Sequence, residues 1–308
     1  MTGKHNRREF LATTAALAGM LGVRRVSAAA ARKPNVIVIV ADDMGWADAG
    51  FNGCKDIPTP GLDRLAQHGV RFQCGYVSHP FCSPTRAGLV TGRYQQRFGH
   101  ENNPTFLPKD ERVGLPLGEV TLANVLKKAG YVTGVVGKWH LGAAPLFHPM
   151  KRGFDEFFGF TGGGHDYFKA DMETETKEYM VPIQRNGKPV VESEYLTDAL
   201  SREAIEFVRR HREEAFFLYL TYNAPHTPQQ APDKYLKRFA AIEDQRRRNY
   251  AAMLSALDDG VGRVLNTLHD LNLEKDTLVF FLSDNGGPVG VNGSSNDPLR
   301  GAKGSVYE

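Results

Sequence analysis

The sequence predicts an α/β fold in which helices sandwich a mostly parallel sheet. Three observations predict it: four continuous apolar runs, amphipathic segments between them, and a length of 308 residues that is ample for one large core. Continuous rather than alternating apolar residues are typical of strands buried on both faces. The predicted strands cover residues 36–40, 131–136, 216–222 and 278–282.

Amphipathic segments between these runs predict the helices. Two short ones, at 62–68 and 122–129, are each followed by a glycine, which is a common helix stop. Two longer ones are predicted over 200–208 and 250–268, the second with apolar residues at a repeated spacing of three and four. We place Asp258 and its neighbour on the solvated face of that helix.

Residues 158–196 interrupt the alternation of strands and helices. The segment contains three consecutive glycines, Gly162 to Gly164, and then mostly polar residues. The pair Asn186-Gly187 is favoured in tight two-residue turns, so a hairpin is predicted there. We expect this segment to be an insertion near the functional site and not a separate domain.

The first 30 residues predict an export signal. They carry a net charge of +4 in a chain of formal charge +3, which leaves −1 for the remainder. The pair Arg7-Arg8 precedes a mildly apolar run over 11–22, shorter than the ~20 residues of a bilayer span. This pattern resembles a bacterial twin-arginine signal, which implies a periplasmic or secreted protein. The alternative is an amphipathic first helix. Because no basic patch and no other apolar span remains, neither nucleic acid nor a membrane is an expected partner.

The three cysteines do not make a disulfide framework. In an oxidising compartment Cys54 and Cys74 are either paired or free, and the sequence leaves this open. Cys82 stays unpaired in either case, and an unpaired cysteine in an exported protein suggests a function.

A helix start beside this cysteine is predicted by the segment Cys82-Ser83-Pro84-Thr85-Arg86. Proline suits the first helical position, where its missing N–H costs nothing, so we place the start at Pro84. Cys82 then lies just ahead of the helix, near N–H groups that attract anions, and Arg86 shares its face at a spacing of four. The alternative is a buried cysteine beside a surface arginine.

Charged or metal-binding residues follow each of the four predicted strands. The carboxyl ends of parallel strands meet at one edge of a sheet, where ligands bind, so we expect these residues to lie together. They are Asp42 and Asp43 after the first strand, Lys138 and His140 after the second, His226 after the third, and Asp284 and Asn285 after the fourth. Singly, the acidic pairs would suit a helix cap or a turn. Charged or metal-binding residues after all four strands favour a functional site.

The oxygen atoms in these clusters predict a divalent cation. Asp42, Asp43 and Asp284 offer carboxylates and Asn285 offers an amide oxygen, the ligands that calcium and magnesium both prefer. A zinc site would need closely spaced histidine and cysteine, which the sequence lacks.

Basic side chains predict that the same pocket binds an anion. With Arg86, Lys138 and Lys303 opposing the three carboxylates, a bound divalent cation would give the pocket a charge of about +2. His140 and His226 are the candidate proton carriers near neutral pH. A weaker candidate for a substrate contact is His165, and the other histidines are expected to be structural.

Six short motifs occur in a fixed order along the chain. They are D-D at 42–43, C-S-P-T-R at 82–86 with T-G-R at 91–93, G-K-W-H-L-G at 137–142, A-P-H at 224–226, S-D-N-G-G at 283–287 and G-A-K-G at 301–304. The chain thereby resembles a type I sulfatase of the alkaline phosphatase superfamily. The resemblance covers residues 34–308 and implies two parts: a signal peptide at 1–30 and a catalytic α/β domain at 31–308. Family members continue into further strands and a smaller C-terminal subdomain, so the resemblance implies a chain truncated at its C-terminus.

The resemblance also implies a modified nucleophile and a metal. Cys82 would be oxidised to formylglycine by a formylglycine-generating enzyme, and the hydrated aldehyde would attack sulfur. The metal would be calcium, with magnesium permitted, and its ligands would be Asp42, Asp43, Asp284, Asn285 and the modified Cys82.

Further roles follow from the same resemblance. Arg86 and Lys138 would hold the sulfate charge, and His226 with Lys303 would protonate or stabilise the leaving oxygen. His140 would deprotonate the second hydroxyl of the hydrated aldehyde and so release sulfate.

The implied activity is hydrolysis of sulfate esters on a sulfated carbohydrate or an aryl sulfate, with release of inorganic sulfate. Residues 147–155 and 292–304 resemble those of galactosamine-sulfate and arylsulfatase-like members. Two alternatives stay open: a phosphonate monoester or phosphodiester hydrolase of the same superfamily, and a non-catalytic glycan-binding fragment.

Overall fold

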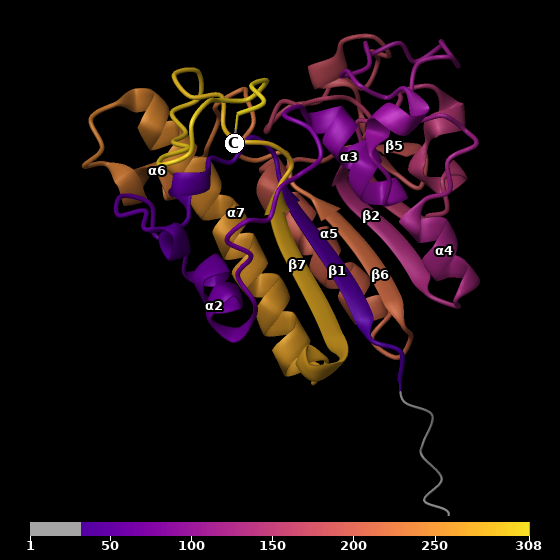
Figure 1. Cartoon of the computed structure of the whole chain (residues 1–308), viewed down its shortest axis with the longest axis horizontal. Helices are drawn as coiled ribbons and strands as arrows, with labels where there is room; N and C mark the ends of the chain where they lie inside the picture. The colour runs from indigo at the N-terminus through magenta and orange to yellow at the C-terminus, as the bar shows by residue number, and fades with distance from the viewer. Residues whose placement is uncertain (1–31, 308) are drawn as a thin grey trace, which may run out of the picture. The chain divides into compact units, whose positions relative to one another are not determined.

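Helices cover both faces of a seven-stranded sheet (Figure 1). This computed structural model describes residues 32–307, so the predicted export signal at 1–30 lies outside the described residues. Residues from Pro34 onward form one compact unit. The strands are β1 Asn35–Ala41, β2 Val132–Lys138, β3 Glu156–Phe160, β4 Ile183–Arg185, β5 Lys188–Val190, β6 Phe216–Thr221 and β7 Thr277–Ser283.

The strand order is β5-β4-β3-β2-β6-β1-β7. Neighbours from β3 to β7 pair in parallel, while β4 is antiparallel to both β3 and β5. The mostly parallel α/β fold is therefore confirmed, and β1, β2, β6 and β7 are the four strands that the apolar runs predict.

The segment 158–196 belongs to the sheet, and the expectation of an insertion is wrong in this respect. Its start overlaps β3, which the sequence analysis missed, and the predicted hairpin supplies β4 and β5. Asn186 and Gly187 both have positive φ, 51° and 79°, as a tight hairpin turn requires. The three strands extend the sheet beyond β2.

The helices of the described residues vary from one turn to seven. They are α2 Pro60–His68, α3 Cys82–Thr91, α4 Leu122–Lys128, α5 Leu196–Arg210, α6 Asp233–Leu236 and α7 Gln245–Asp270. Short 3-10 helices are η1 Trp46–Asp48, η2 Gly50–Asn52, η3 Gln95–Phe98, η4 Pro145–Phe147, η5 Pro149–Lys151, η6 Glu178–Met180, η7 Lys237–Phe239 and η8 Glu274–Asp276. Within the described range, none of the helices has both the length and the apolar character to cross a membrane.

Two hydrophobic cores lie on opposite faces of the sheet. The larger one packs α5 and α7 against one face, through residues such as Leu200, Phe207 and Leu257. The smaller one packs α3 and α4 against the other, through Val90 and Ala123. Figure 1 shows α5 behind the sheet and α3 in front of it. This sandwich holds the carboxyl ends of the strands at one edge of the molecule.

Strand β7 forms an open edge of the sheet, contrary to the expected burial of both faces. Val279 and Phe281 pack toward the α5 and α7 core. Leu278 and Phe280 point to the other face, where they are 52% and 48% exposed. No described strand pairs with the outer edge of β7.

Asp258 is buried, and its expected place on a solvated helix face is wrong. Its two carboxylate oxygens accept hydrogen bonds from the backbone N–H groups of Gly61 and Leu62, at 2.9 and 2.8 Å. These groups belong to the first turn of α2, whose N–H groups have no partner within the helix. Asp258 on α7 therefore caps α2, a contact between segments far apart in the sequence.

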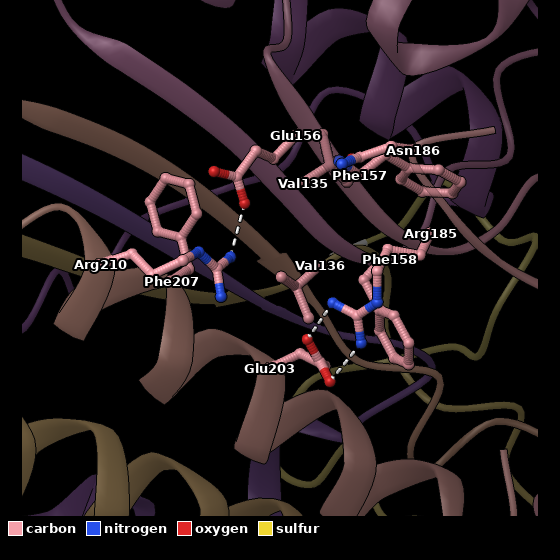
Figure 2. Close-up of a pocket in the computed structure, with 10 residues that line it drawn as sticks. All are labelled: Val135, Val136, Glu156, Phe157, Phe158, Arg185, Asn186, Glu203, Phe207 and Arg210. Atoms are coloured by element: carbon pink, nitrogen blue, oxygen red, sulfur yellow. Dashed lines mark hydrogen bonds and ion pairs between the residues drawn. The ribbon is translucent and has the colours of Figure 1, made fainter. Parts of the chain in front are cut away.

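A small cavity lies between β3 and α5 and is lined by two ion pairs (Figure 2). Glu203 pairs with Arg185, and Glu156 with Arg210. The cavity measures about 20 Å³, room for a single water molecule. A larger cleft of about 530 Å³ is lined by charged residues of α2, α5, α6 and α7. Neither space contains a predicted site residue.

Candidate active site

The carboxyl ends of β1, β6 and β7 bring the acidic residues side by side. Asp42 follows β1, and its backbone N–H donates to the carbonyl of Ala224, which follows β6, at 3.1 Å. Asp284 follows β7, and its N–H donates to the carbonyl of Ala41 at 3.0 Å. The pairing between strands therefore continues past their ends and fixes these two turns together.

Four buried side chains converge at this edge. One potential ligand atom from each of Asp42, Asp43, Cys82 and His226 lies within 4.8 Å of the others. Asp43 has a φ of 66°, a left-handed conformation that asparagine and aspartate tolerate better than most residues. This turn lets the carboxylates of two consecutive residues face one pocket.

Helix α3 begins at Cys82, two residues before the predicted start at Pro84. Pro84 then lies in the first turn. Backbone N–H groups there have no partner within the helix, so a proline without an N–H breaks no helical hydrogen bond. Thr85 stabilises this turn, because its Oγ1 donates a hydrogen bond to the His79 carbonyl at 2.6 Å. The spacing argument is confirmed, because Cys82 and Arg86 both point into the acidic site.

The Cys82 thiol is buried between an acid and a base. Its Sγ lies 3.6 Å from Asp42 Oδ1 and accepts from Lys303 Nζ at 3.2 Å. Burial raises the pKa of Cys82 to about 12, and the carboxylates of Asp42, Asp284 and Asp43 add to the rise while Lys138 opposes it. A thiol with this pKa is protonated at neutral pH and is a poor nucleophile.

Two fully buried cations balance the carboxylates. Arg86 donates from Nη2 and Nε to Asp284 Oδ2, and Lys138 donates from Nζ to Asp42 Oδ2 at 2.5 Å. Burial alone would lower the pKa of Arg86, but the carboxylates of Asp284 and Asp42 raise it overall. Burial raises the pKa of Asp284, whereas for Asp42 the adjacent Lys138 and other cations overcome burial and lower the pKa.

The donor set fits a hard divalent cation. Asn285 donates from Nδ2 to Asp43 Oδ1 at 2.7 Å, which leaves its Oδ1 buried without a partner. A buried amide oxygen without a partner is costly unless a ligand satisfies it. Asp284 is joined to the cluster through the N–H of Asp43, which donates to its Oδ1 at 3.3 Å. Asp42, Asp43, Asp284 and Asn285 therefore bring carboxylate and amide oxygens, the ligands that a hard cation prefers, into one network of contacts.

His140 is buried at the pocket with a strained backbone. Its φ is 57°, and its Nδ1 has no hydrogen-bond partner. Burial lowers the pKa of His140 well below its usual range, and the nearby Lys138 and Arg86 lower it further. The surroundings therefore favour the neutral imidazole, whose Nδ1 has no hydrogen-bond partner.

His226 and Lys303 complete the predicted set. The ring of His226 contacts the Thr227 carbonyl through Nδ1 at 2.6 Å, so Nδ1 is the donor and Nε2 faces Asp43 Oδ2 at 3.6 Å. Lys303 Nζ lies 2.7 Å from Asp43 Oδ1. Burial would lower the pKa of Lys303, but Cys82 and Asp43 raise it overall, so the side chain stays charged.

The ten predicted site residues lie close together: nine are joined by the contacts described above, and His140 lies near Lys138 and Arg86. The weaker candidate, His165, has a different environment. His165 is buried, and its two ring nitrogens contact the carbonyls of Asp166 and Val181 at 2.6 and 2.7 Å. Both nitrogens are thus engaged, so His165 is structural. Cys54 and Cys74 are free and form no disulfide.

Ser83, beside the site, has a contact that the sequence analysis did not anticipate. Ser83 donates from Oγ to the His140 carbonyl at 2.6 Å and contacts His100 Nε2 at 2.7 Å. This joins α3 to the backbone of His140. His100 had been expected to be structural, which fits this contact, and its only signal in the sequence was its residue type.

Comparison with known proteins identifies the family. The model of the family described as Sulfatase matches residues 34–308, nearly the whole described range. The chain belongs to the sulfatase family. The matched range contains every residue of the pocket.

Two relatives and one solved structure show how similar individual sulfatases are to this chain. N-acetylgalactosamine-6-sulfatase of Mus musculus is 37% identical over 92% of this chain and 56% of its own length. Arylsulfatase A of Homo sapiens is 35% identical over 91% of this chain and 58% of its own. A crystal structure of Ps i-CgsB in complex with k-i-k-neocarrahexaose is 46% identical, with a TM-score of 0.84, over 89% of this chain and 63% of that one. This sulfatase chain therefore spans a little over half the length of the curated relatives.

Proposed function

We propose that this protein hydrolyses sulfate esters and releases inorganic sulfate. The observation that carries the proposal is the burial of Cys82 Sγ at the N-terminus of α3 among Asp42, Asp43 and His226, within 4.8 Å. Membership of the sulfatase family supports it. The thiol itself is protonated, so we propose that Cys82 acts after conversion to formylglycine by a formylglycine-generating enzyme.

A divalent cation is part of the proposal. Asp42, Asp43, Asp284 and Asn285 would hold it together with residue 82, and calcium is proposed ahead of magnesium. Such an ion supplies Lewis-acid polarisation at this point, and hydrated formylglycine supplies a nucleophilic oxygen. The unpartnered Oδ1 of Asn285 supports a cation here.

The charges of the pocket suit a sulfate group. Arg86, Lys138 and Lys303 balance the carboxylates of Asp42, Asp43 and Asp284, so that a divalent cation makes the pocket positive. These buried cations are in place before substrate arrives and stabilise charge that develops on sulfate oxygens. Arg86 and Lys138 bind the sulfate charge in this proposal.

The two histidines take opposite proton-transfer roles. The Nδ1 of His140 has no hydrogen-bond partner, and in this proposal the imidazole accepts a proton as sulfate is released. His226 presents Nε2 to the pocket, and with Lys303 it protonates or stabilises the leaving oxygen.

The proposed substrate is a sulfated carbohydrate, and the proposed location is the periplasm or the exterior of a bacterial cell. A relative named for N-acetylgalactosamine 6-sulfate supports the substrate, as does a neighbour solved with a neocarrahexaose. The location depends on the pattern of the first 30 residues.

Tandem mass spectrometry of the tryptic peptide 72–86 tests the modification. The chain is produced together with a formylglycine-generating enzyme, and the peptide contains Cys74 as an internal control. We expect an aldehyde at position 82 and an intact thiol at position 74. A persistent thiol at 82 contradicts the proposed nucleophile and favours a binding role.

Turnover of matched esters tests the activity. The modified chain is assayed with 4-nitrophenyl sulfate, a phosphonate monoester, a phosphodiester and N-acetylgalactosamine 6-sulfate, with Cys82→Ala as the control. We expect sulfate ester turnover that the control lacks. Preferred turnover of the phosphorus esters would identify the alternative hydrolase of the same superfamily.

A further inference from the structure

The ring of His140 has no hydrogen bond to hold it. Its backbone is fixed, because the N–H donates to the Thr161 carbonyl at 3.2 Å and the carbonyl accepts from Ser83 Oγ at 2.6 Å. Its Nδ1 is buried without a partner, and no hydrogen bond joins the ring to any other residue in the described range. Packing must therefore set the orientation of the imidazole.

Gly163 packs directly on this ring. A Cβ atom added to Gly163 would lie 2.6 Å from His140 Nε2 and 2.8 Å from its Cε1, closer than non-bonded atoms approach. The backbone of Gly163 is thus the surface on which one edge of the imidazole rests. Because buried groups are close-packed, a shift of Gly163 changes the room available to the ring.

Glu178 holds the backbone of Gly163 in place. Its Oε1 accepts a hydrogen bond from the Gly163 N–H at 2.5 Å. The same oxygen would lie 3.0 Å from a Cβ atom at Gly163, so the glycine is enclosed between the carboxylate and the imidazole.

The segment that carries Glu178 is itself anchored. Its neighbours Tyr179 and Met180 accept backbone hydrogen bonds from Asp166 and Asp171, at 2.8 and 2.7 Å. One residue further on, the Val181 carbonyl contacts the ring of His165 at 2.7 Å. Glu178 therefore lies on a segment that is held by hydrogen bonds, and its carboxylate can restrain the backbone of Gly163.

We infer that Glu178 is a positioning residue for His140 and acts through the backbone of Gly163. The inference rests on the proposed function, in which His140 accepts a proton. Without the hydrogen bond, Gly163 is free to move and the imidazole loses the surface that orients it. Misplacement of a proton acceptor by about 1 Å lowers the rate of the chemical step.

Kinetics of four variants test the role in turnover. Glu178→Ala removes the acceptor, Glu178→Gln keeps it, and Gly163→Ala pushes on the ring. Glu175→Ala is a control in the same segment, where Glu175 forms an ion pair with exposed Lys109. We expect kcat to fall by about 10- to 100-fold in Glu178→Ala and Gly163→Ala, with KM changed by less than about twofold. Glu178→Gln and Glu175→Ala should retain wild-type kcat. A raised KM with unchanged kcat would instead make Glu178 a substrate contact and overturn the inference.

NMR of the imidazole groups gives a readout that does not depend on turnover. Histidine is isotopically labelled in the chain with unmodified Cys82, and the His140 signals are assigned by their loss in His140→Gln. We expect these signals to shift or broaden in Glu178→Ala and Gly163→Ala, and to stay in place in Glu178→Gln and Glu175→Ala. Unchanged His140 signals in Glu178→Ala would overturn the inference. Shifted signals here, together with no sulfate ester turnover by the formylglycine-containing chain, would instead defeat the proposed function and leave the positioning role standing.

Discussion

Arg86 donates two hydrogen bonds to one oxygen of Asp284, from Nε at 3.0 Å and from Nη2 at 2.8 Å. Both side chains are fully buried. The third donor, Nη1, binds the carbonyl of Lys138 at 3.0 Å, so one guanidinium joins α3, β2 and the end of β7. An ammonium group cannot reproduce this planar arrangement.

Arg86→Met is expected to destabilise the fold by about 3–5 kcal/mol, because it leaves the carboxylate of Asp284 buried without its partner. Arg112→Met is the matched control, since Arg112 pairs with Asp110 on the surface and is 88% exposed. The control should cost far less, because water screens the exposed pair of Arg112 and Asp110. Urea unfolding of both variants measures the difference, and equal losses would contradict the structural role of Arg86.

Removal of the Asn285 amide oxygen is expected to weaken cation binding. Calcium titration of the chelator-treated protein by calorimetry should show an affinity at least about 10-fold lower in Asn285→Ala than in the wild type. Asn266→Ala is the control, because Asn266 pairs with Arg64 on the surface. Unchanged calcium affinity in Asn285→Ala would remove this residue from the site.

Loss of His226 is expected to lower turnover most for substrates with poor leaving groups. In His226→Ala, turnover of a sugar sulfate should fall by about 100-fold or more, because its leaving oxygen needs a proton. Turnover of 4-nitrophenyl sulfate should fall much less, since nitrophenolate leaves without protonation. Equal losses on the two substrates, measured as kcat/KM, would contradict the acid role of His226.

The pair of Asp56 and Arg247 predicts a stability change at acid pH. Hydrogen bonds from Arg247 lower the pKa of Asp56 from 3.8 to about 2. A carboxyl group whose pKa is lower in the folded protein stabilises the fold at pH values above its pKa in the unfolded chain. This stabilisation is lost as the pH falls through the pKa of the folded protein. Because Asp56 is partly exposed, Asp56→Asn should cost less than about 1 kcal/mol at pH 7.

The difference between wild type and Asp56→Asn should shrink as pH falls from about 4 to about 2. Urea unfolding at several pH values measures it. A difference that stays constant or grows toward low pH would show that the contact acts by packing and not by charge.

The sequence predicted the pocket well because strand ends are local features. Continuous apolar runs mark β1, β2, β6 and β7, and parallel pairing brings their following residues to one edge. Residues that directly follow a strand, such as Asp42, Asp284 and Asn285, are therefore placed by sequence position alone. His226, close behind β6, is placed in the same way.

Contacts between segments that are distant in the sequence could not be predicted from sequence position. The bond from Asp258 to the start of α2 joins residues nearly 200 positions apart, and a helical pattern cannot show which surface residue meets another helix. The contacts of Ser83 with His140 and of Glu178 with Gly163 have the same origin. Strand β3 was missed because Glu156 and Gly159 break its apolar run.

Within the described residues β7 is an unpaired edge strand, and such strands favour strand addition between molecules in concentrated solution. A seven-residue edge strand with Leu278 and Phe280 exposed offers both unpaired backbone groups and apolar side chains to a second molecule. We expect sedimentation velocity to show association that increases with protein concentration and is reduced in Phe280→Lys, with Val191→Lys, another exposed apolar position, as the control. Identical sedimentation of the two variants would show that the edge is not adhesive. A preparation intended for kinetics or NMR would therefore benefit from a charge placed at Phe280, on the exposed face of β7.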